Sequence, residues 1–201
     1  MDHKIDRRVR KTKALLQNSL LELMKAKPLK NITIKELVDH ADVNRSTFYL
    51  HYSSIYDIIE EMEQSLLDQV CQIFDTYPDD YNEENSFSFI SAMLQIVFDN
   101  LETCNILLDP KYNTKFIEKI QMVLDKKVEE RMQHILGQDF RISSYLSSFY
   151  ITGCMGMLRT WRLDENRPIP DTMAKICYSL IMNTVDQMKN VSFKELSSAG
   201  V

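Results

Sequence analysis

Apolar residues recur along the chain at spacings of three and four positions, which is the periodicity of an amphipathic α-helix. The first such stripe ends before Pro28, which cannot continue a helix, so we predict a helix over about residues 7–26. Its buried face is formed by Leu16, Leu20, Leu23 and Met24. Further helices are predicted over residues 87–102, 112–136, 142–162 and 171–188, while residues 190–201 have little pattern. With only 4 Gly and 5 Pro available for tight turns, we predict an all-α protein.

Two capping boxes mark further helix starts near the N-terminus. Thr33 and Glu36 have the spacing of the first box, which predicts a short helix from Ile34. Ser54 and Asp57 have the spacing of the second, which predicts a long helix reaching about residue 74. The acidic, turn-rich run 79–85 ends that long helix.

Between these boxes, Asn44 is placed to cap a third short helix over residues 45–51. Two short helices joined by a three-residue turn, with one helix before and a long one after, have the spacing of a helix-turn-helix. The apolar positions predicted to hold the two helices together are Leu37, Val38, Val43 and Phe48. The positions left free to enter a major groove are Arg45, Ser46, Thr47, Tyr49 and His51.

Charge is distributed unevenly along the chain. The net charge is −5, from 24 Lys and Arg against 29 Asp and Glu. Residues 1–51 carry a net +5, so the remainder carries −10. A basic N-terminal module on an acidic protein favours a local contact with a polyanion, although a solvated charged arm is an equal alternative. The basic segment 4–13 is expected to contact phosphates or the minor groove, and to be disordered when unbound.

Over about residues 10–60 the chain resembles the TetR family of transcriptional regulators. The resemblance is carried by residues 32–38, 41–52 and 56–59, and above all by the run Thr47-Phe48-Tyr49-Leu50-His51-Tyr52. It implies an N-terminal three-helix DNA-binding domain with a helix-turn-helix (residues 1–55) and a C-terminal helical ligand-binding and dimerisation domain (residues 56–201). It also implies a repressor that a small apolar effector releases from a palindromic operator.

The family pattern assigns roles to individual positions in double-stranded DNA binding. The resemblance implies base contacts in the groove from Arg45, Ser46, Thr47 and Tyr49. It implies phosphate contacts from Thr33, Lys35, Tyr49, His51 and Tyr52. For Tyr52, covering the edge of the core is an equal alternative.

Two positions depart from the family pattern. Asp42 stands in the turn where the family usually has Gly, and Asp tolerates a left-handed backbone better than most residues. Ile55 stands where the family usually has a phosphate-binding Lys at the start of the fourth helix. The missing cation is expected to weaken DNA binding and to lower its salt dependence by about one unit of slope.

The last two helices are predicted to form a homodimer. Small side chains recur every four residues in the first of them, at Ser144, Ser148, Thr152, Gly156 and Thr160. The second has an apolar stripe of Met173, Ile176, Cys177, Leu180, Ile181, Thr184 and Met188. Packing within one chain is the alternative for both features. A twofold dimer predicts a palindromic operator.

The middle helices are expected to enclose an effector pocket, as the resemblance implies. The candidate lining residues are Met62, Leu66, Met93, Phe98, Tyr112, Phe116, Phe149 and Trp161. Met and aromatic residues at helical spacing are more often core, which is the competing interpretation. Few ionisable groups fall among them, so an apolar effector is favoured, and neither a cofactor nor a metal is expected.

Other classes of protein are less well supported. The four histidines make no HxxxH pair, and no P-loop, G-x-S-x-G or G-x-G-x-x-G motif is present, so an enzyme is not expected. The four cysteines make no CxxC pair and the Met1 end has no secretory pattern, which favours a cytoplasmic protein with reduced core thiols. A TetR-like scaffold that binds a protein partner instead of DNA remains the alternative.

Overall fold

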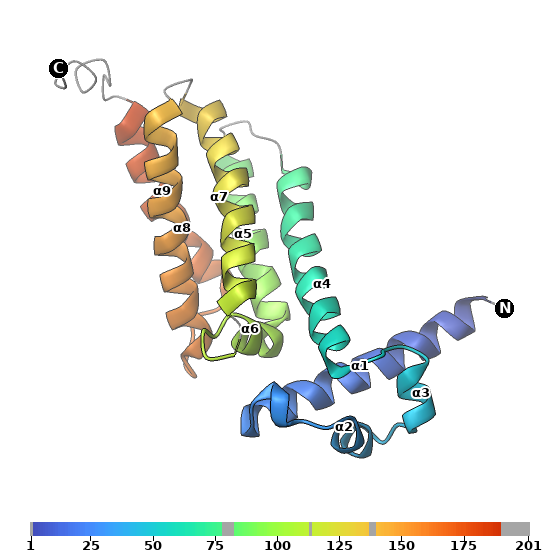
Figure 1. Ribbon diagram of the computed structural model, residues 1–201. Coiled ribbons are helices and arrows are strands. Elements are labelled where there is room, and N and C mark those ends of the chain that lie inside the picture. Colours follow the sequence, from blue (N-terminus) through green and yellow to red (C-terminus); the bar gives the residue numbers. More distant parts are fainter. Residues whose placement is uncertain (1, 78–82, 113, 137–139, 190–201) are drawn as a thin grey trace. The chain divides into compact units, whose positions relative to one another are not determined.

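The computed structural model describes residues 2–77, 83–112, 114–136 and 140–189, and these form helices throughout (Figure 1). The α-helices are α1 (Asp2–Ala26), α2 (Ile34–Ala41), α3 (Arg45–Tyr49), α4 (Ile55–Thr76), α5 (Glu83–Asp99), α6 (Leu101–Leu107), α7 (Thr114–Leu136), α8 (Phe140–Leu163) and α9 (Pro170–Lys189). A 3₁₀ turn, Leu29–Asn31, follows α1. No strand occurs in the described ranges, which confirms the all-α prediction.

The chain divides into two compact units. The first comprises residues 1–68 and 102–117, and the second comprises residues 69–101 and 118–201. The division therefore falls within α4, whereas the boundary predicted from the sequence, after residue 55, lies at the start of that helix. The tail 190–201 lies outside the described residues.

In the first unit α2 packs against both α1 and α3. The completely buried side chains include Leu16 and Leu20 from α1, Leu37 from α2, Phe48 from α3 and Ile58 from α4. Of the four apolar residues predicted to hold the short helices together, Leu37, Val38 and Phe48 are buried, whereas Val43 is half-buried in the turn. Burying such side chains is worth about 1.5–3 kcal/mol each, so this core fixes the α2–α3 geometry.

The predicted start of α1 at about residue 7 was too late. The helix begins at Asp2, so the basic segment 4–13 is helical in the free protein instead of being a disordered arm. Its residues Lys4, Arg7 and Lys11 favour helix on intrinsic propensity. The tertiary contacts of the second half of α1 then support a helix that extends through the arm.

Both predicted capping boxes are present. The Thr33 hydroxyl accepts a hydrogen bond from the Glu36 N–H (3.2 Å), and the Glu36 carboxylate accepts one from the Thr33 N–H (3.1 Å). Asp57 likewise accepts from the Ser53 and Ser54 N–H groups, at 2.7 and 3.1 Å. These side chains satisfy donors that a helix start leaves without an intrahelical partner.

The predicted side-chain cap at Asn44 was wrong. Asn44 occupies the N-cap position of α3, but its side chain makes no capping hydrogen bond. Its backbone carbonyl accepts from the Phe48 N–H (3.1 Å), so the first turn of α3 closes through the main chain. Phe48, at the end of this turn, is fully buried.

In the second unit α5 packs along α9. Met132 from α7, Tyr150 from α8 and Val185 from α9 form a buried cluster that joins these three helices. Figure 1 shows α8 and α9 running side by side, with α9 reached through the turn after Leu163. This arrangement leaves one face of each of the last two helices for the surface.

The helix predicted over residues 87–102 is displaced and divided. It begins at Glu83, four residues before the predicted start. It ends at Asp99, and α6 begins at Leu101. The Asn100 amide donates hydrogen bonds to the Ile96 carbonyl (2.9 Å) and to Gln69 (3.1 Å), which holds the break between the helices.

Candidate nucleic-acid interface

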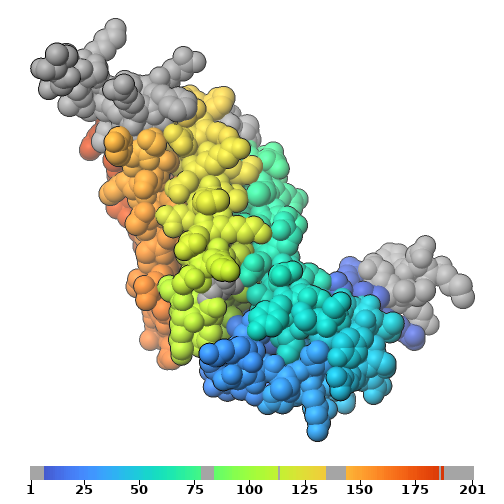
Figure 2. All heavy atoms as spheres, viewed as in Figure 1, coloured from blue at the N-terminus to red at the C-terminus, as the bar shows by residue number. Residues whose placement is uncertain are grey.

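Helix α3 buries one face and exposes the other. Phe48 is fully buried, whereas Arg45, Ser46 and Tyr49 are exposed, with 49% of the Tyr49 surface accessible. Thr47 and His51 are half-buried at the edges of this face. The segment that contains α2 and α3 lies on the surface of the first unit (Figure 2). The face predicted to read a DNA groove is therefore open to solvent in the free protein.

Arg45 and Tyr49 form a pair on that exposed face. The Arg45 guanidinium donates a hydrogen bond to the Tyr49 hydroxyl (3.2 Å) and lies 5.6 Å from the centre of its ring. The Tyr49 ring in turn meets Phe48 edge to face, with ring centres 5.3 Å apart. The pair is thus attached to the core through Phe48, which limits the rotamers that either side chain can adopt.

The turn between α2 and α3 depends on Asp42. Its backbone has φ 52° and ψ 47°, the left-handed conformation that the family usually assigns to Gly. The Val43 N–H donates to the Val38 carbonyl (3.0 Å), which closes the end of α2. An Asp at this position therefore supports the same turn, at a modest steric cost relative to Gly.

At the start of α2, Lys35 and Thr33 are both exposed, as phosphate contacts require. Thr33 already uses its N–H and its hydroxyl, which donate to the Glu36 carboxylate at 3.1 Å each. The ion pair with Lys27, followed by the hydrogen bonds from Thr33, lowers the pKa of Glu36 to about 2. Glu36 is therefore ionised at neutral pH, and a DNA phosphate at Thr33 has to compete with it.

The sequence predicts that Tyr52 contacts a DNA phosphate, but the structure places this residue in the core. Only 4% of its surface is accessible, and its ring packs against Phe48 with centres 6.0 Å apart. Its hydroxyl is buried without a hydrogen-bond partner in the described part of the chain. Burial, with a smaller contribution from the Glu61 carboxylate, raises the pKa of Tyr52 and keeps the phenol neutral.

The structure contains a polar cluster beside Tyr52 that the sequence did not predict. The Lys13 ammonium lies 5.3 Å from the centre of the Tyr52 ring and pairs with the Glu61 carboxylate at 2.6 Å. Gln17 donates to the same carboxylate at 3.4 Å. These contacts join α1 to α4 across 44 to 48 positions, and no local pattern in the sequence indicates them.

Ile55, which stands where a phosphate-binding Lys was expected, is also a core residue. Only 6% of its surface is accessible, next in sequence to the capping segment of α4. The hydrogen-bond donors at the start of α4 are occupied by Asp57, whose pKa the Ser54 hydroxyl and the neighbouring N–H groups lower. The start of α4 therefore carries a negative charge instead of a positive one.

The eight predicted pocket residues fall four in each unit. In the first unit Met62, Leu66 and Phe116 are buried and Tyr112 is half-buried. In the second unit Trp161 is buried and stacks on Phe98, with ring centres 6.3 Å apart, and its indole N–H donates to the Pro168 carbonyl. Met93 is half-buried, and Phe149 is 67% exposed on the outside of α8.

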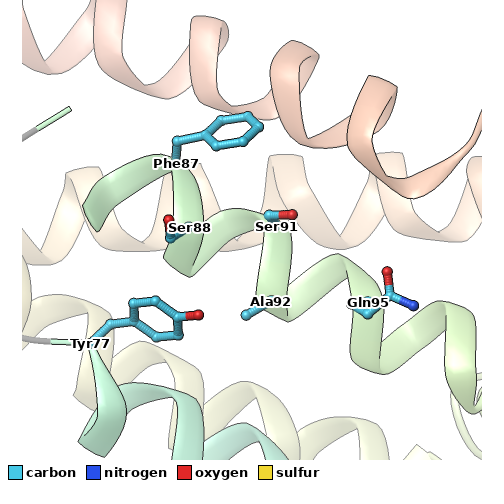
Figure 3. Close-up of a pocket in the computed structure, with 6 residues that line it drawn as sticks. All are labelled: Tyr77, Phe87, Ser88, Ser91, Ala92 and Gln95. Atoms are coloured by element: carbon cyan, nitrogen blue, oxygen red, sulfur yellow. The ribbon is translucent and has the colours of Figure 1, made fainter. Parts of the chain in front are cut away.

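The structure has a hollow of about 300 Å³ elsewhere in the second unit (Figure 3). Its lining residues are Tyr77, at the end of α4, and Phe87, Ser88, Ser91, Ala92 and Gln95 along α5. None of the eight predicted residues contributes to it. Its serine and glutamine side chains make it more polar than the pocket expected from the sequence.

The outer faces of α8 and α9 expose small and apolar side chains. All five members of the predicted small-residue row in α8 are exposed, and a Cβ added at Gly156 would meet no atom within 4 Å. The apolar stripe predicted in α9 is only partly exposed. Met173 and Cys177 are buried, whereas Leu180 is 60% exposed. Further exposed apolar residues on the two helices are Tyr145, Phe149, Leu163 and Ile176.

The described residues hold no group of three His, Cys, Asp or Glu side chains arranged to bind a metal ion. None of the described helices combines the length and apolar character needed to cross a membrane.

Two family models match the chain. Residues 19–62 match the model of bacterial regulatory proteins of the tetR family, and residues 84–183 match that of a transcriptional regulator C-terminal region. The first match contains α2 and α3, and the second contains α6, α7 and α8. The chain belongs to the TetR family of transcriptional regulators, whose members bind DNA and are typically dimeric.

Individual relatives agree with this assignment. A 57-residue segment is 39% identical to an uncharacterized HTH-type transcriptional regulator, YxbF of Bacillus subtilis, and covers 26% of this chain and 15% of that protein. The fold is similar to that of a TetR regulator from Streptococcus agalactiae (TM-score 0.58, 20% identity, covering 90% of this chain and 99% of the other). It is also similar to that of a putative TetR-family regulator from Syntrophomonas wolfei (TM-score 0.69, 12% identity, 88% and 96%). NalD, the secondary repressor of the MexAB-OprM multidrug efflux pump in Pseudomonas aeruginosa, has a similar fold (TM-score 0.62, 15% identity, 87% and 95%).

Proposed function

We propose that this regulator is a repressor that binds a palindromic operator through α3. The observation that carries the proposal is the division of α3 into a buried Phe48 and an exposed polar face. Arg45, Ser46, Thr47 and Tyr49 are assigned to the major groove, where Arg most often reads guanine. Lys35, Thr33 and His51 are assigned to phosphates. Tyr52, because it is buried, is assigned to the support of Phe48.

A homodimer through α8 and α9 is part of this proposal. The exposed row of small residues in α8 allows a second helix to approach closely, and the exposed Phe149 and Leu180 supply apolar surface beside it. Within one chain these side chains are exposed to solvent, which favours a contact with a second chain over intrachain packing. A twofold axis between the two copies would present two α3 helices to two operator half-sites.

Release from the operator is proposed to follow the binding of a small apolar molecule. The residues proposed for its site include Met62, Leu66 and Phe116 of the first unit, which are buried, apolar and without ionisable groups. An effector that binds better to a conformation with misplaced α3 helices would shift the population towards it and lower operator affinity. The protein is proposed to act in the cytoplasm, where its DNA is.

The test is a fluorescence anisotropy titration of the full chain with DNA from upstream of its own gene, at two salt concentrations. Tight binding to one segment, weaker binding to a scrambled segment of equal length and a steep loss of affinity with salt support the proposal. Equal binding to both segments, or no binding, contradicts it. Analytical ultracentrifugation of the same samples measures the dimer.

A second candidate is a TetR-like protein that acts through a protein partner instead of DNA. The observation in its favour is the start of α4, where Ile55 is buried and Asp57 carries a negative charge in place of a phosphate-binding cation. The overall net charge of −5 points the same way. A dimer without DNA affinity in the titration above would favour this candidate.

A further inference from the structure

The second unit contains a sulfur cluster that DNA binding and dimerisation do not use. The Cys177 thiol on α9 donates a hydrogen bond to the Met157 thioether on α8, with the two sulfur atoms 3.9 Å apart. Cys154 lies three positions before Met157 on α8, so both side chains are on the same side of that helix. The Cys154 thiol therefore lies on the side of α8 from which Met157 contacts Cys177 of α9.

Burial governs the acidity of both thiols. Burial, with a smaller contribution from the neighbouring ionisable thiol of Cys154, raises the pKa of Cys177 to about 12. Burial also raises the pKa of Cys154. Both cysteines are therefore neutral thiols in the free protein and poor nucleophiles, which argues against spontaneous reaction with electrophiles.

The spacing of the sulfur atoms matches that of ligands on one metal ion. Two sulfurs that each lie about 2.3 Å from one ion, at an angle of about 120°, are about 4 Å apart. The Cys177–Met157 separation of 3.9 Å has this value without any movement of the helices. Cys177 is buried, whereas Cys154 and Met157 are half-buried and leave an approach from solvent.

The donor set selects the kind of ion. Zinc usually takes four ligands from Cys, His, Asp and Glu, and no group of three such residues occurs among the described residues. Thiolate with thioether is instead the ligand combination that favours Cu(I). A thiolate formed at Cys154 or Cys177 would neutralise the charge of a monovalent ion in this largely apolar site, and its proton would pass to solvent.

We propose that Cys154, Met157 and Cys177 form a binding site for one Cu(I) ion per chain. The ion would link α8 to α9, the two helices with exposed apolar faces, and no change of oxidation state is involved. The site does not depend on the proposed operator binding, because its residues are far in sequence from α3 and its test uses no DNA.

The test is a titration of the reduced, full-length protein, without oxygen, against Cu(I) held by a competing chromogenic chelator. The wild-type chain is expected to withdraw one equivalent of Cu(I) from the chelator and to gain ultraviolet thiolate-to-copper absorption. Ligand binding to the native state is also expected to raise the thermal midpoint. Failure of the wild type to compete for Cu(I) overturns the proposal.

The variants separate the site from other thiols. Cys154→Ser and Met157→Leu change half-buried side chains, and each is expected to weaken Cu(I) binding by more than about tenfold. Cys177→Ser should do the same, with circular dichroism as a check on folding because this residue is buried. Cys71→Ser is the matched control, since Cys71 is a half-buried free thiol on α4, and it should bind as the wild type does. Binding that survives Cys154→Ser and Met157→Leu, or is lost in Cys71→Ser, contradicts the proposal.

Discussion

The Arg45 guanidinium and the Tyr49 hydroxyl are joined by a hydrogen bond of 3.2 Å, one turn apart on the exposed face of α3. The pair exists before any DNA is bound, and Tyr49 rests edge to face on the buried Phe48. Ordering a long side chain at an interface costs about 0.5–1.5 kcal/mol, so a pair that is already ordered lowers the cost of binding.

Arg45→Ala is therefore expected to abolish the preference for the operator over scrambled DNA. Loss of a bidentate base contact costs about 1–3 kcal/mol of discrimination in each half-site. The thermal midpoint should change little, because an exposed substitution usually alters the free energy of unfolding by less than about 0.5 kcal/mol. Competition anisotropy measures the preference, and Lys126→Ala, which removes an exposed cation on α7, is the control. A large loss of stability in Arg45→Ala would show instead that its stacking on Tyr49 supports the fold.

Lys35→Gln is expected to weaken binding to all DNA sequences alike. One phosphate contact fewer lowers the slope of log K against log salt by about 0.9 per half-site. Anisotropy at four salt concentrations gives this slope, and Lys119→Gln on α7 is the matched control. An unchanged slope with normal operator affinity would show that Lys35 does not contact a DNA phosphate.

The capping carboxylate of α2 predicts a pH dependence of stability. The folded-state pKa of Glu36 is about 2, below its ordinary value of 4.5, so its contribution is present above pH 4.5 and is lost as the pH falls towards 2. The thermal midpoint of the wild type should therefore exceed that of Glu36→Gln at pH 6, and the two should converge near pH 2. A difference that stays constant over this range would mean that the carboxylate charge does not stabilise the helix.

Two substitutions at Tyr52 test whether this residue supports the core. Tyr52→Phe removes a buried hydroxyl that has no hydrogen-bond partner in the described chain, so stability and operator affinity should both be retained. Tyr52→Ala removes a ring that is 4% exposed and is expected to cost about 3–5 kcal/mol of unfolding free energy. Urea denaturation measures the stability of both. If Tyr52→Phe has normal stability but binds the operator several-fold more weakly, the Tyr52 hydroxyl contacts a phosphate, as the sequence predicted.

The local features of the fold could be predicted from the sequence, because their causes are local. The capping boxes at Thr33 and Ser54 and the left-handed turn at Asp42 depend on residues within four positions of each other. For Tyr52 the local pattern left a core position and a phosphate contact equally open, because its surroundings also include the Lys13–Glu61 pair, which comes from distant positions on α1 and α4.

The effector pocket is the part of the protein that is hardest to predict from the sequence. Apolar side chains at helical spacing look the same whether they fill a core, line a pocket or face a partner. Trp161 and Phe98 stack on each other, whereas Phe149 is exposed on α8 among the residues assigned to the dimer. The hollow beside Ser88 and Ser91 has no apolar stripe that would have marked it.

The exposed faces of α8 and α9 give the sharpest test of the assembly. Leu180→Arg places a charge on a side chain that is 60% exposed in the single chain, so the fold should tolerate it. At the centre of an apolar interface, however, the same unpaired charge opposes association, and sedimentation should show a monomer. Operator affinity should fall with it, because two linked half-site contacts become independent. Met122→Arg is the matched control, since Met122 is 70% exposed on α7, and it should remain dimeric and bind DNA normally. A dimer that persists in Leu180→Arg, and also in Phe149→Arg, would place the subunit interface on another surface.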